Sequence, residues 1–230
     1  MAATTLLFDG VKTASTITRR VLVFYSGGKD SVVTLDLCNR YFDYVQPVFM
    51  YASPILSFQS AIIRWAEARY GVPPLLVPHP MLAEWLRYGT FRPPDYGVPT
   101  ISFLDVYTYV RSQTGIWWIA AGERIADSIV RRAMIKHDGG CIDDGRGRFY
   151  PVANWQKDDV VKYIKHHKLK VSPESAYLGY SFRSLAGKDL HQIKRHYPDD
   201  YDALKAWFPL LGASLAKYEF GLENTEDTAA

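Results

Sequence analysis

The segment of this chain best suited to chemistry on a phosphate group is the hexapeptide Ser-Gly-Gly-Lys-Asp-Ser at 26–31. It lies between the apolar run 21–25 and a helical pattern that begins at Asp30, so it joins a predicted strand to a predicted helix. Glycines let the backbone approach an anion, the first amides of a helix attract negative charge, and Lys29 adds a cation. The predicted phosphate-binding loop consists of Ser26, Gly27, Gly28, Lys29, Asp30 and Ser31.

This loop is not a Walker A loop. That motif reads Gly-x-x-x-x-Gly-Lys-Ser/Thr and needs a hydroxyl residue directly after its lysine. Here Asp30 follows Lys29, and Val23 stands in the place of the first glycine. The ordinary P-loop is therefore excluded.

A second segment with phosphate-binding residue types, 122–131, follows the predicted strand 116–121. Its two arginines carry planar, permanently charged guanidinium groups that match phosphate oxygens. A plainer interpretation of the segment taken alone is a helix start capped by Asp127, with both arginines in solvent. The predicted binding residues of this segment are Gly122, Arg124, Asp127, Ser128 and Arg131.

Alternating strands and helices are predicted to position the two motifs. The predicted strands are the apolar runs 21–25, 45–51, 75–77, 116–121 and 149–152. The predicted helices are 30–41, 57–70, 81–88, 102–112, 122–136 and 156–167. This alternation indicates an α/β fold with a doubly wound, parallel, five-stranded sheet in the order 3-2-1-4-5. Its ligand crevice would lie between strands one and four, the two strands that end in the motifs.

The chain shows no internal repeat and no linker, so a single domain is predicted. An extension at 1–20, to which no structure is assigned, precedes the nucleotide-binding α/β part at 21–170. A helical C-terminal region of the same domain follows at 171–222, and an acidic tail at 223–230.

The loop 26–31 resembles the pyrophosphate-binding loop of the N-type ATP pyrophosphatase (PP-loop) superfamily. Segment 122–131 resembles the Gly-x-Arg-x-x-(acidic or amide)-Ser-x-x-Arg element of the phosphoadenylyl sulfate (PAPS) reductase-like branch, at the same spacings. The resemblance covers roughly 20–210. It implies an adenine nucleotide alpha hydrolase-like, Rossmann-like fold.

A third match to the same branch begins at Tyr150, where relatives have Asn, and continues to Ile164. Trp155, Val160 and Tyr163 share one helix face with Ile164, so we expect core packing from them and no catalysis. The segment from Gly179 onward is similar to the C-terminal part of reductase-like proteins of phages and mobile elements.

The chain departs from the reductases at their cysteines. Phe220 stands where those enzymes carry a nucleophilic cysteine, and a phenyl ring cannot act as a nucleophile. The segment 184–187 lacks the Cys-x-x-Cys pair of many relatives. The two cysteines, Cys38 and Cys141, are expected to be reduced thiols, with carboxylates near Cys141 discouraging its ionisation.

The resemblance implies an enzyme that cleaves ATP at the α-phosphate, releases pyrophosphate and adenylylates an acceptor, which a nucleobase or nucleic acid could supply. Two alternatives stay open: a sulfonucleotide reductase or sulfotransfer-type enzyme that uses an external thiol, and a non-catalytic nucleotide-binding subunit. The residues expected to act on the phosphates are Lys29, Asp30, Arg124 and Arg131.

The cofactors predicted are ATP and Mg²⁺, with Asp30 the one candidate ligand to Mg²⁺ and with neither an iron–sulfur cluster nor zinc. Eight Lys and Arg residues against two carboxylates in 160–197 make nucleic acid a candidate partner; a solvated helix face is the plainer explanation. No apolar run approaches the roughly 20 residues of a membrane span, and no signal peptide is visible, so a cytoplasmic location is predicted. A homodimer is left open.

Overall fold

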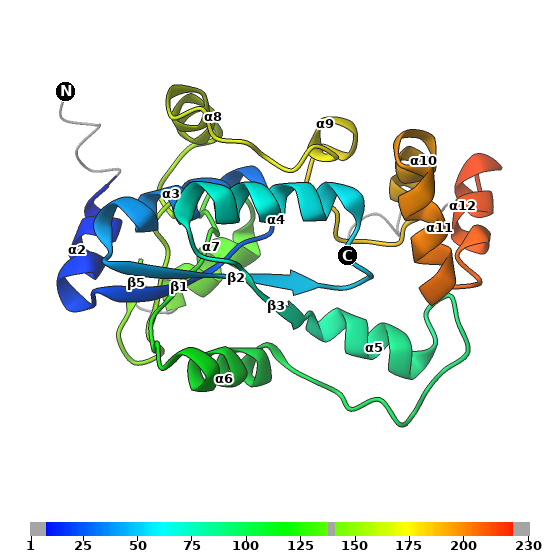
Figure 1. Ribbon diagram of the computed structural model, residues 1–230, viewed down its shortest axis with the longest axis horizontal. Coiled ribbons are helices and arrows are strands. Elements are labelled where there is room, and N and C mark those ends of the chain that lie inside the picture. The colour runs from blue at the N-terminus through cyan, green and yellow to red at the C-terminus, as the bar shows by residue number, and fades with distance from the viewer. Residues whose placement is uncertain (1–7, 138–140, 223–230) are drawn as a thin grey trace. The chain divides into compact units, whose positions relative to one another are not determined.

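The computed structural model describes residues 8–137 and 141–222. The described residues contain six strands: β1 (Arg20–Phe24), β2 (Tyr44–Tyr51), β3 (Leu75–Pro78), β4 (Ile119–Ala120), β5 (Ile142–Asp143) and β6 (Arg148–Phe149). They form one sheet in the order β3-β2-β1-β4-β6-β5. β1 and β2 lie side by side in this sheet (Figure 1). β1 pairs in parallel with β2 and β4, and β4 pairs in parallel with β6. The predicted doubly wound α/β fold is therefore confirmed.

The sixth strand is a difference from the prediction. β5 pairs with β6 in antiparallel fashion and lies outside all of the predicted strands and helices. A tight turn reverses the chain between them: the Gly147 amide donates to the Asp144 carbonyl at 3.3 Å, and Gly147 has φ +60°. A two-residue strand leaves no periodic pattern, so the sequence does not signal it.

Helices occupy most of the remaining chain: α2 (Asp9–Ile17), α3 (Lys29–Tyr41), α4 (Ser57–Tyr70), α5 (Pro80–Tyr88), α6 (Phe103–Thr114), α7 (Ile129–His137), α8 (Lys157–His166), α9 (Ser175–Leu178), α10 (Gly187–His196), α11 (Pro198–Trp207) and α12 (Gly212–Glu219). The predicted helical C-terminal region is present. α2 lies in the extension to which no structure was assigned. Within the described residues, no helix is long and apolar enough to cross a membrane.

The fold divides into two compact units, which are described separately. The sheet unit comprises Met1–Met50, Ile62–Val77 and Tyr107–Ser172, and the helical unit comprises Tyr51–Ala61, Pro78–Val106 and Pro173–Ala230.

The core of the sheet unit is built around β1 and α3. Val21, Leu22 and Val23 are fully buried, as expected for a central strand with both faces covered. α3 buries every residue from Ser31 to Cys38, which explains why its pattern is apolar on more than one side. The helix that follows the phosphate-binding loop is thus held on all sides.

A buried carboxylate fixes α3 to its neighbours. Asp36 is 2% exposed and accepts hydrogen bonds from Tyr70 Oη of α4 at 2.9 Å and Tyr163 Oη of α8 at 2.8 Å. Arg40 Nε, one helical turn later, donates to it at 2.6 Å. Burial alone would raise the pKa of Asp36, but the hydrogen bonds from Arg40, Tyr163 and Tyr70 together lower that pKa below its ordinary value.

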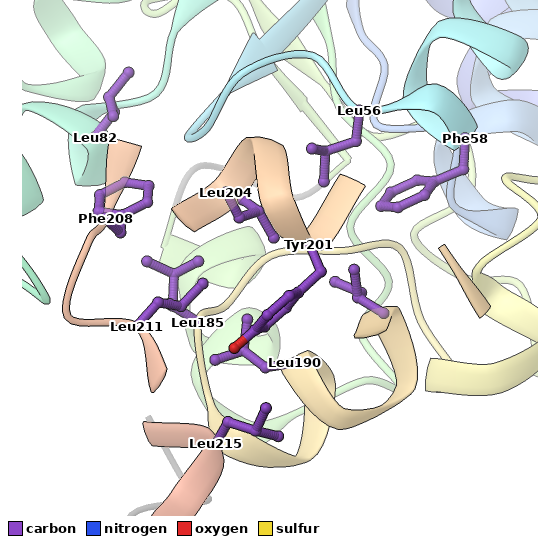
Figure 2. Close-up of a cluster of buried hydrophobic side chains, with 11 residues drawn as sticks. Leu56, Phe58, Leu82, Leu185, Leu190, Tyr201, Leu204, Phe208, Leu211 and Leu215 are labelled. Carbon is purple, nitrogen blue, oxygen red and sulfur yellow. The ribbon is translucent and has the colours of Figure 1, made fainter. Parts of the chain in front are cut away.

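The helical unit has its own core (Figure 2). α10 contributes Leu190 and Ile193, and α11 contributes Tyr201 and Leu204, in each case three residues apart on one helix face. The other buried members are Leu56, Phe58, Leu82, Leu185, Phe208, Leu211 and Leu215. Asp200 joins two distant segments of this unit, since its carboxylate accepts from the Ser57 amide at 2.8 Å and the Ser57 hydroxyl at 2.7 Å.

We expect Asp36→Asn to destabilise the protein by about 2 kcal/mol at neutral pH, because an ionised acceptor of three hydrogen bonds is lost. The pKa of Asp36 is lowered in the folded state. Its stabilising contribution is therefore present above the unfolded pKa of roughly 3.9 and disappears as the pH falls through the folded-state pKa. Urea unfolding of wild type and variant between pH 7 and pH 3 should show the two stabilities converging at low pH.

Asp43→Asn is the matched control, because Asp43 pairs with Arg19 on the surface, where ion pairs contribute little. Equal losses of stability in the two variants, or a difference for Asp36→Asn that is as large at pH 3 as at pH 7, would contradict the role given to the buried network.

Candidate functional site

The loop 26–31 connects β1 to α3 in a shape that requires glycine at position 27. Gly27 has φ +76°, and a Cβ there would lie 2.9 Å from Ile62 Cγ2 and 3.1 Å from Ser172 Cβ. Its carbonyl accepts from the Ser172 amide at 2.8 Å. The backbone is thus packed closely where the chain turns from strand to helix.

The opening of α3 presents backbone amides without a side-chain cap. Gly28 is the residue before the first helical turn, and as a glycine it has no side chain to accept from the amides of that turn. The Gly28 amide itself donates to Ser26 Oγ at 3.4 Å. The first amides of a helix have no partner within the helix and carry the positive end of its dipole. This end of α3 is suited to an anion.

The two serines of the loop stabilise its shape. Ser31 Oγ donates to the Gly28 carbonyl at 3.0 Å and accepts from the Ser26 amide at 3.2 Å. The Ser26 and Ser31 hydroxyl oxygens lie 3.2 Å apart.

A chain of charged groups joins the loop to the second motif. Lys29 Nζ lies 2.6 Å from one oxygen of Asp30, and Arg124 Nε lies 2.9 Å from the other. Arg124 also pairs with Asp127, which in turn lies 2.7 Å from Arg131 Nη1. The structure therefore brings the charged residues of the two sequence motifs into one network.

Gly122 allows this network to form. A Cβ at Gly122 would lie 3.2 Å from both the Asp30 carbonyl carbon and the Ser31 amide nitrogen. The end of β4 can approach the first turn of α3 this closely only because position 122 has no side chain.

Arg124 is placed differently from its expected role as a phosphate ligand. The residue is 5% exposed, and its guanidinium contacts two carboxylates and the Trp155 carbonyl, the latter at 3.4 Å. Lys29 and Arg131 have side chains that are 38% and 42% exposed. The cations that reach solvent are thus Lys29 and Arg131, while Arg124 orients their carboxylate partners.

Asp30, the one candidate ligand to Mg²⁺, has each of its two oxygens within 2.9 Å of a cationic side chain. Asp127 likewise divides its oxygens between two arginines. Ser128 Oγ accepts from the Arg131 amide at 3.1 Å, as an N-cap side chain does. The capping interaction ascribed to Asp127 in the plainer interpretation is therefore made by Ser128.

Sequence reasoning missed Glu123, which lies between Gly122 and Arg124. Within the described part of the chain, Glu123 Oε2 is buried and has no hydrogen-bond partner. The sequence signal for Glu123 was its place in the segment 122–131, directly after a predicted buried strand. Sequence reasoning also missed the Trp155 carbonyl as a hydrogen-bond acceptor for Arg124. The expected core packing of Trp155, Val160 and Tyr163 is confirmed by their burial.

Neither cysteine is an activated thiol. Burial raises the pKa of Cys38, which is fully buried. Burial also raises the pKa of the half-buried Cys141, although Asn154 Nδ2, at 3.5 Å from its sulfur, acts in the opposite direction. The expected direction for Cys141 is correct, but its cause is burial and not the nearby carboxylates.

The basic stretch 160–197 is shared by the two units, which meet in the sequence at Ser172. Its two carboxylates, Glu174 and Asp189, are 2% and 1% exposed, so the exposed charges of the stretch are basic. Among its aromatic residues, Tyr177 stacks on His196 with ring centroids 3.7 Å apart, and Phe182 packs against the helical core.

We expect Gly122→Ala to destabilise the protein by about 1–3 kcal/mol, because its methyl group would push against the backbone of Asp30 and Ser31. Chemical denaturation measures the loss. Gly212→Ala is the matched control, since a Cβ at Gly212 meets nothing within 4 Å and lies at the start of α12. A Gly122→Ala variant as stable as the control would show that β4 and α3 do not depend on this close approach.

Comparison with known proteins supports the assignment that the motifs suggest. The family model of the phosphoadenosine phosphosulfate reductase domain matches residues 20–174. No curated protein sequence matches the chain.

Two solved structures share the fold. The PAPS reductase of Candida auris, in a phosphate complex, has 14% identity and a TM-score of 0.54, and the match covers 77% of this chain and 87% of that one. The U34-tRNA thiolase NcsA of Methanococcus maripaludis, with its [4Fe-4S] cluster, has 16% identity and a TM-score of 0.50, and the match covers 90% of this chain and 80% of that one.

The thiolase structure contradicts the cofactor prediction made from the sequence. The sequence predicted ATP and Mg²⁺ as cofactors. It led us to exclude an iron–sulfur cluster and zinc, because neither cysteine belongs to a Cys-x-x-Cys pair. A protein of similar fold holds such a cluster. The exclusion was wrong because cluster ligands need not be close in sequence. Among the residues that the structure describes, no group of three His, Cys, Asp or Glu side chains is arranged to hold a metal ion.

The loop at the end of β1 and the motif after β4 are joined by one charged network, and the family model covers both. The resemblance to the PP-loop superfamily is thereby confirmed, and the chain belongs to the phosphoadenosine phosphosulfate reductase domain family.

Proposed function

We propose that this protein is an enzyme that cleaves ATP between its α- and β-phosphates and transfers the adenylyl group to an acceptor. An acceptor oxygen would form a bond to the α-phosphorus while the bond to the bridging oxygen breaks and pyrophosphate leaves. A second nucleophile could then displace AMP from the adenylylated acceptor. The observation that carries this proposal is the network from Lys29 to Arg131, which holds two exposed cations at the amino end of α3.

The residues of this network would act in different ways. The amides that open α3, together with Lys29, would bind the β- and γ-phosphates, and Arg131 would neutralise charge that develops on the leaving pyrophosphate. We assign Arg124 a positioning role, because it is buried and its guanidinium pairs with two carboxylates and donates to the Trp155 carbonyl. In-line displacement at phosphorus depends mainly on positioning and charge neutralisation.

The acceptor that we propose is a nucleobase or another group of a nucleic acid. The support is the exposed charge of 160–197, which contains eight basic residues and two carboxylates, both of them buried. Such an excess of exposed positive charge favours a polyanionic partner.

A second candidate function is sulfonucleotide chemistry with an external thiol. The family match over residues 20–174 favours it. The chain's own thiols do not, because burial raises the pKa of both. Phe220, where reductases carry the nucleophilic cysteine, is a 78% exposed phenyl ring.

We expect ATP, in a magnesium-containing buffer, to raise the free energy of unfolding by about 2.7 kcal/mol at 100 times its dissociation constant. Lys29→Ala should remove most of this gain. The gain is taken relative to the same protein without nucleotide, because the variant without nucleotide also loses one cationic partner of Asp30. Thermal unfolding at a series of ATP concentrations, including none, measures the gain in each protein.

Lys157→Ala provides the control, since Lys157 begins α8 and is exposed. Stabilisation by ATP that is the same in all three proteins would exclude loop 26–31 as the nucleotide site.

The products distinguish the two candidate reactions. With ATP and single-stranded RNA or DNA, we expect pyrophosphate to form in an amount equal to the sum of free AMP and AMP bonded to the nucleic acid. A Cys38→Ala, Cys141→Ser double variant should retain this activity. Chromatography of the nucleotides with a pyrophosphate assay gives the readout. Sulfite released from PAPS in the presence of a thiol, without AMP from ATP, would favour the second candidate instead.

A further inference from the structure

A row of alternating aromatic and arginine residues crosses the sheet at the amino ends of its strands. Arg20 pairs with Tyr44 in the register of β1 and β2. Leu22 pairs with Ile119, so two residues earlier Trp117 comes level with Arg20. Arg146 lies in the turn before β6, next to Gly147, which packs against the Trp117 indole. Residues in register on neighbouring parallel strands face the same side of a sheet, so Arg20 and Tyr44 share one face. We call Tyr44, Arg20, Trp117 and Arg146 the amino-edge row.

The row is held in place by stacking and by backbone carbonyls. The Arg20 guanidinium lies 5.5 Å from the Tyr44 ring centroid, and Arg111 of α6 lies 3.8 Å from the ring centroid of Trp117. Arg111 Nε donates to the Trp117 carbonyl at 2.8 Å, and Arg111 Nη2 donates to the Arg146 carbonyl at 2.6 Å. These bonds order the row before any partner binds.

Gly147 completes the setting of Trp117. A Cβ at position 147 would lie 2.3 Å from the indole Nε1, so the backbone of the turn packs directly against the edge of the ring. The indole is nevertheless 52% exposed, and Tyr44 is 38% exposed. Two ordered aromatic surfaces are therefore open to solvent.

Positive charge gathers along this edge. Of the row, Arg146 has Asp143 at 3.7 Å. Arg148 Nε is buried with no hydrogen-bond partner in the part of the chain described. Burial, followed by the like charge of Arg148, lowers the pKa of Arg111. Guanidinium groups held this close to one another favour an anion beside them.

The row lies at the opposite end of β1 from the loop 26–31, because Arg20 begins that strand and the loop follows Phe24. It is thus a surface separate from the proposed nucleotide site.

We propose that the amino-edge row binds single-stranded nucleic acid, with bases stacked on Trp117 and Tyr44 and phosphates paired with Arg20 and Arg146. Exposed rings that alternate with guanidinium groups match the way in which single strands are bound, by stacking and by neutralisation of the backbone. An acidic protein or a membrane surface would use the charges but would gain little from two separate, half-exposed rings. The proposal names the partner class of the proposed function and gives it a docking surface.

The test is the fluorescence anisotropy of labelled 20-nucleotide oligo(dT) and oligo(U), measured without ATP over a salt series. We expect Trp117→Ala to weaken binding about tenfold through the loss of one stacked base. Arg20→Gln and Arg146→Gln should each reduce the dependence of log affinity on log salt by about 0.7, the effect of one phosphate contact on a single strand. Trp117→Phe should bind close to wild type, because a ring remains.

Tyr88→Ala provides the matched control. Tyr88 is 63% exposed and lies 5.9 Å from the Arg87 guanidinium, so it is an aromatic–arginine pair outside the row. If Trp117→Ala is unstable, the two surface arginine variants still decide. The proposal is overturned if oligonucleotides do not bind at low salt, if Tyr88→Ala weakens binding as much as Trp117→Ala, or if only Lys165→Gln and Lys194→Gln weaken it.

The outcome can be separated from that of the proposed function, because binding is measured without nucleotide. Stabilisation by ATP should be unchanged in all amino-edge variants, so failure of oligonucleotide binding leaves the ATP site standing. Conversely, Lys29→Ala should leave oligonucleotide affinity unchanged.

Discussion

The arrangement of the candidate site depends on the ion pair between Asp30 and Arg124. The two side chains are 19% and 6% exposed, so both charges have lost most of their contact with water. Such a pair is stable only when each charge keeps additional partners, and here Lys29 and Asp127 supply them. Because Asp30 belongs to the first turn of α3 and Arg124 follows β4, this pair fixes the spacing of the two segments that border the site.

α3 is held by buried charge at two places. Asp30 fixes its first turn to the segment after β4, and Asp36, nearly two turns later, accepts hydrogen bonds from α4 and α8. The first contact is an ion pair and the second consists of hydrogen bonds. The direction of the helix axis is therefore set by these polar interactions as well as by apolar packing. A helix that must present its amides to a ligand benefits from this double constraint, since a small rotation would misdirect all of them.

The sequence was sufficient to predict the parts of the fold that are coded locally. An apolar run predicts β1, two glycines predict the loop after it, and a helical pattern that follows directly predicts α3. β4 was predicted from the apolar run 116–121. The Asp36 network could not be predicted, because its partners Tyr70 and Tyr163 come from distant helices. The burial of Arg124 was missed because the residue type suggests a solvent-exposed guanidinium, and only the fold reveals that it lies between two carboxylates.

The hydrogen bond between the Ser172 amide and the Gly27 carbonyl has a consequence for protein synthesis. The loop is encoded near the start of the chain, but one of its supports is encoded far later. A nascent polypeptide on the ribosome would therefore carry the complete glycine motif for most of translation without the backbone contact that shapes it. Maturation of the site is in this sense a late event, tied to the emergence of the segment that ends the sheet unit.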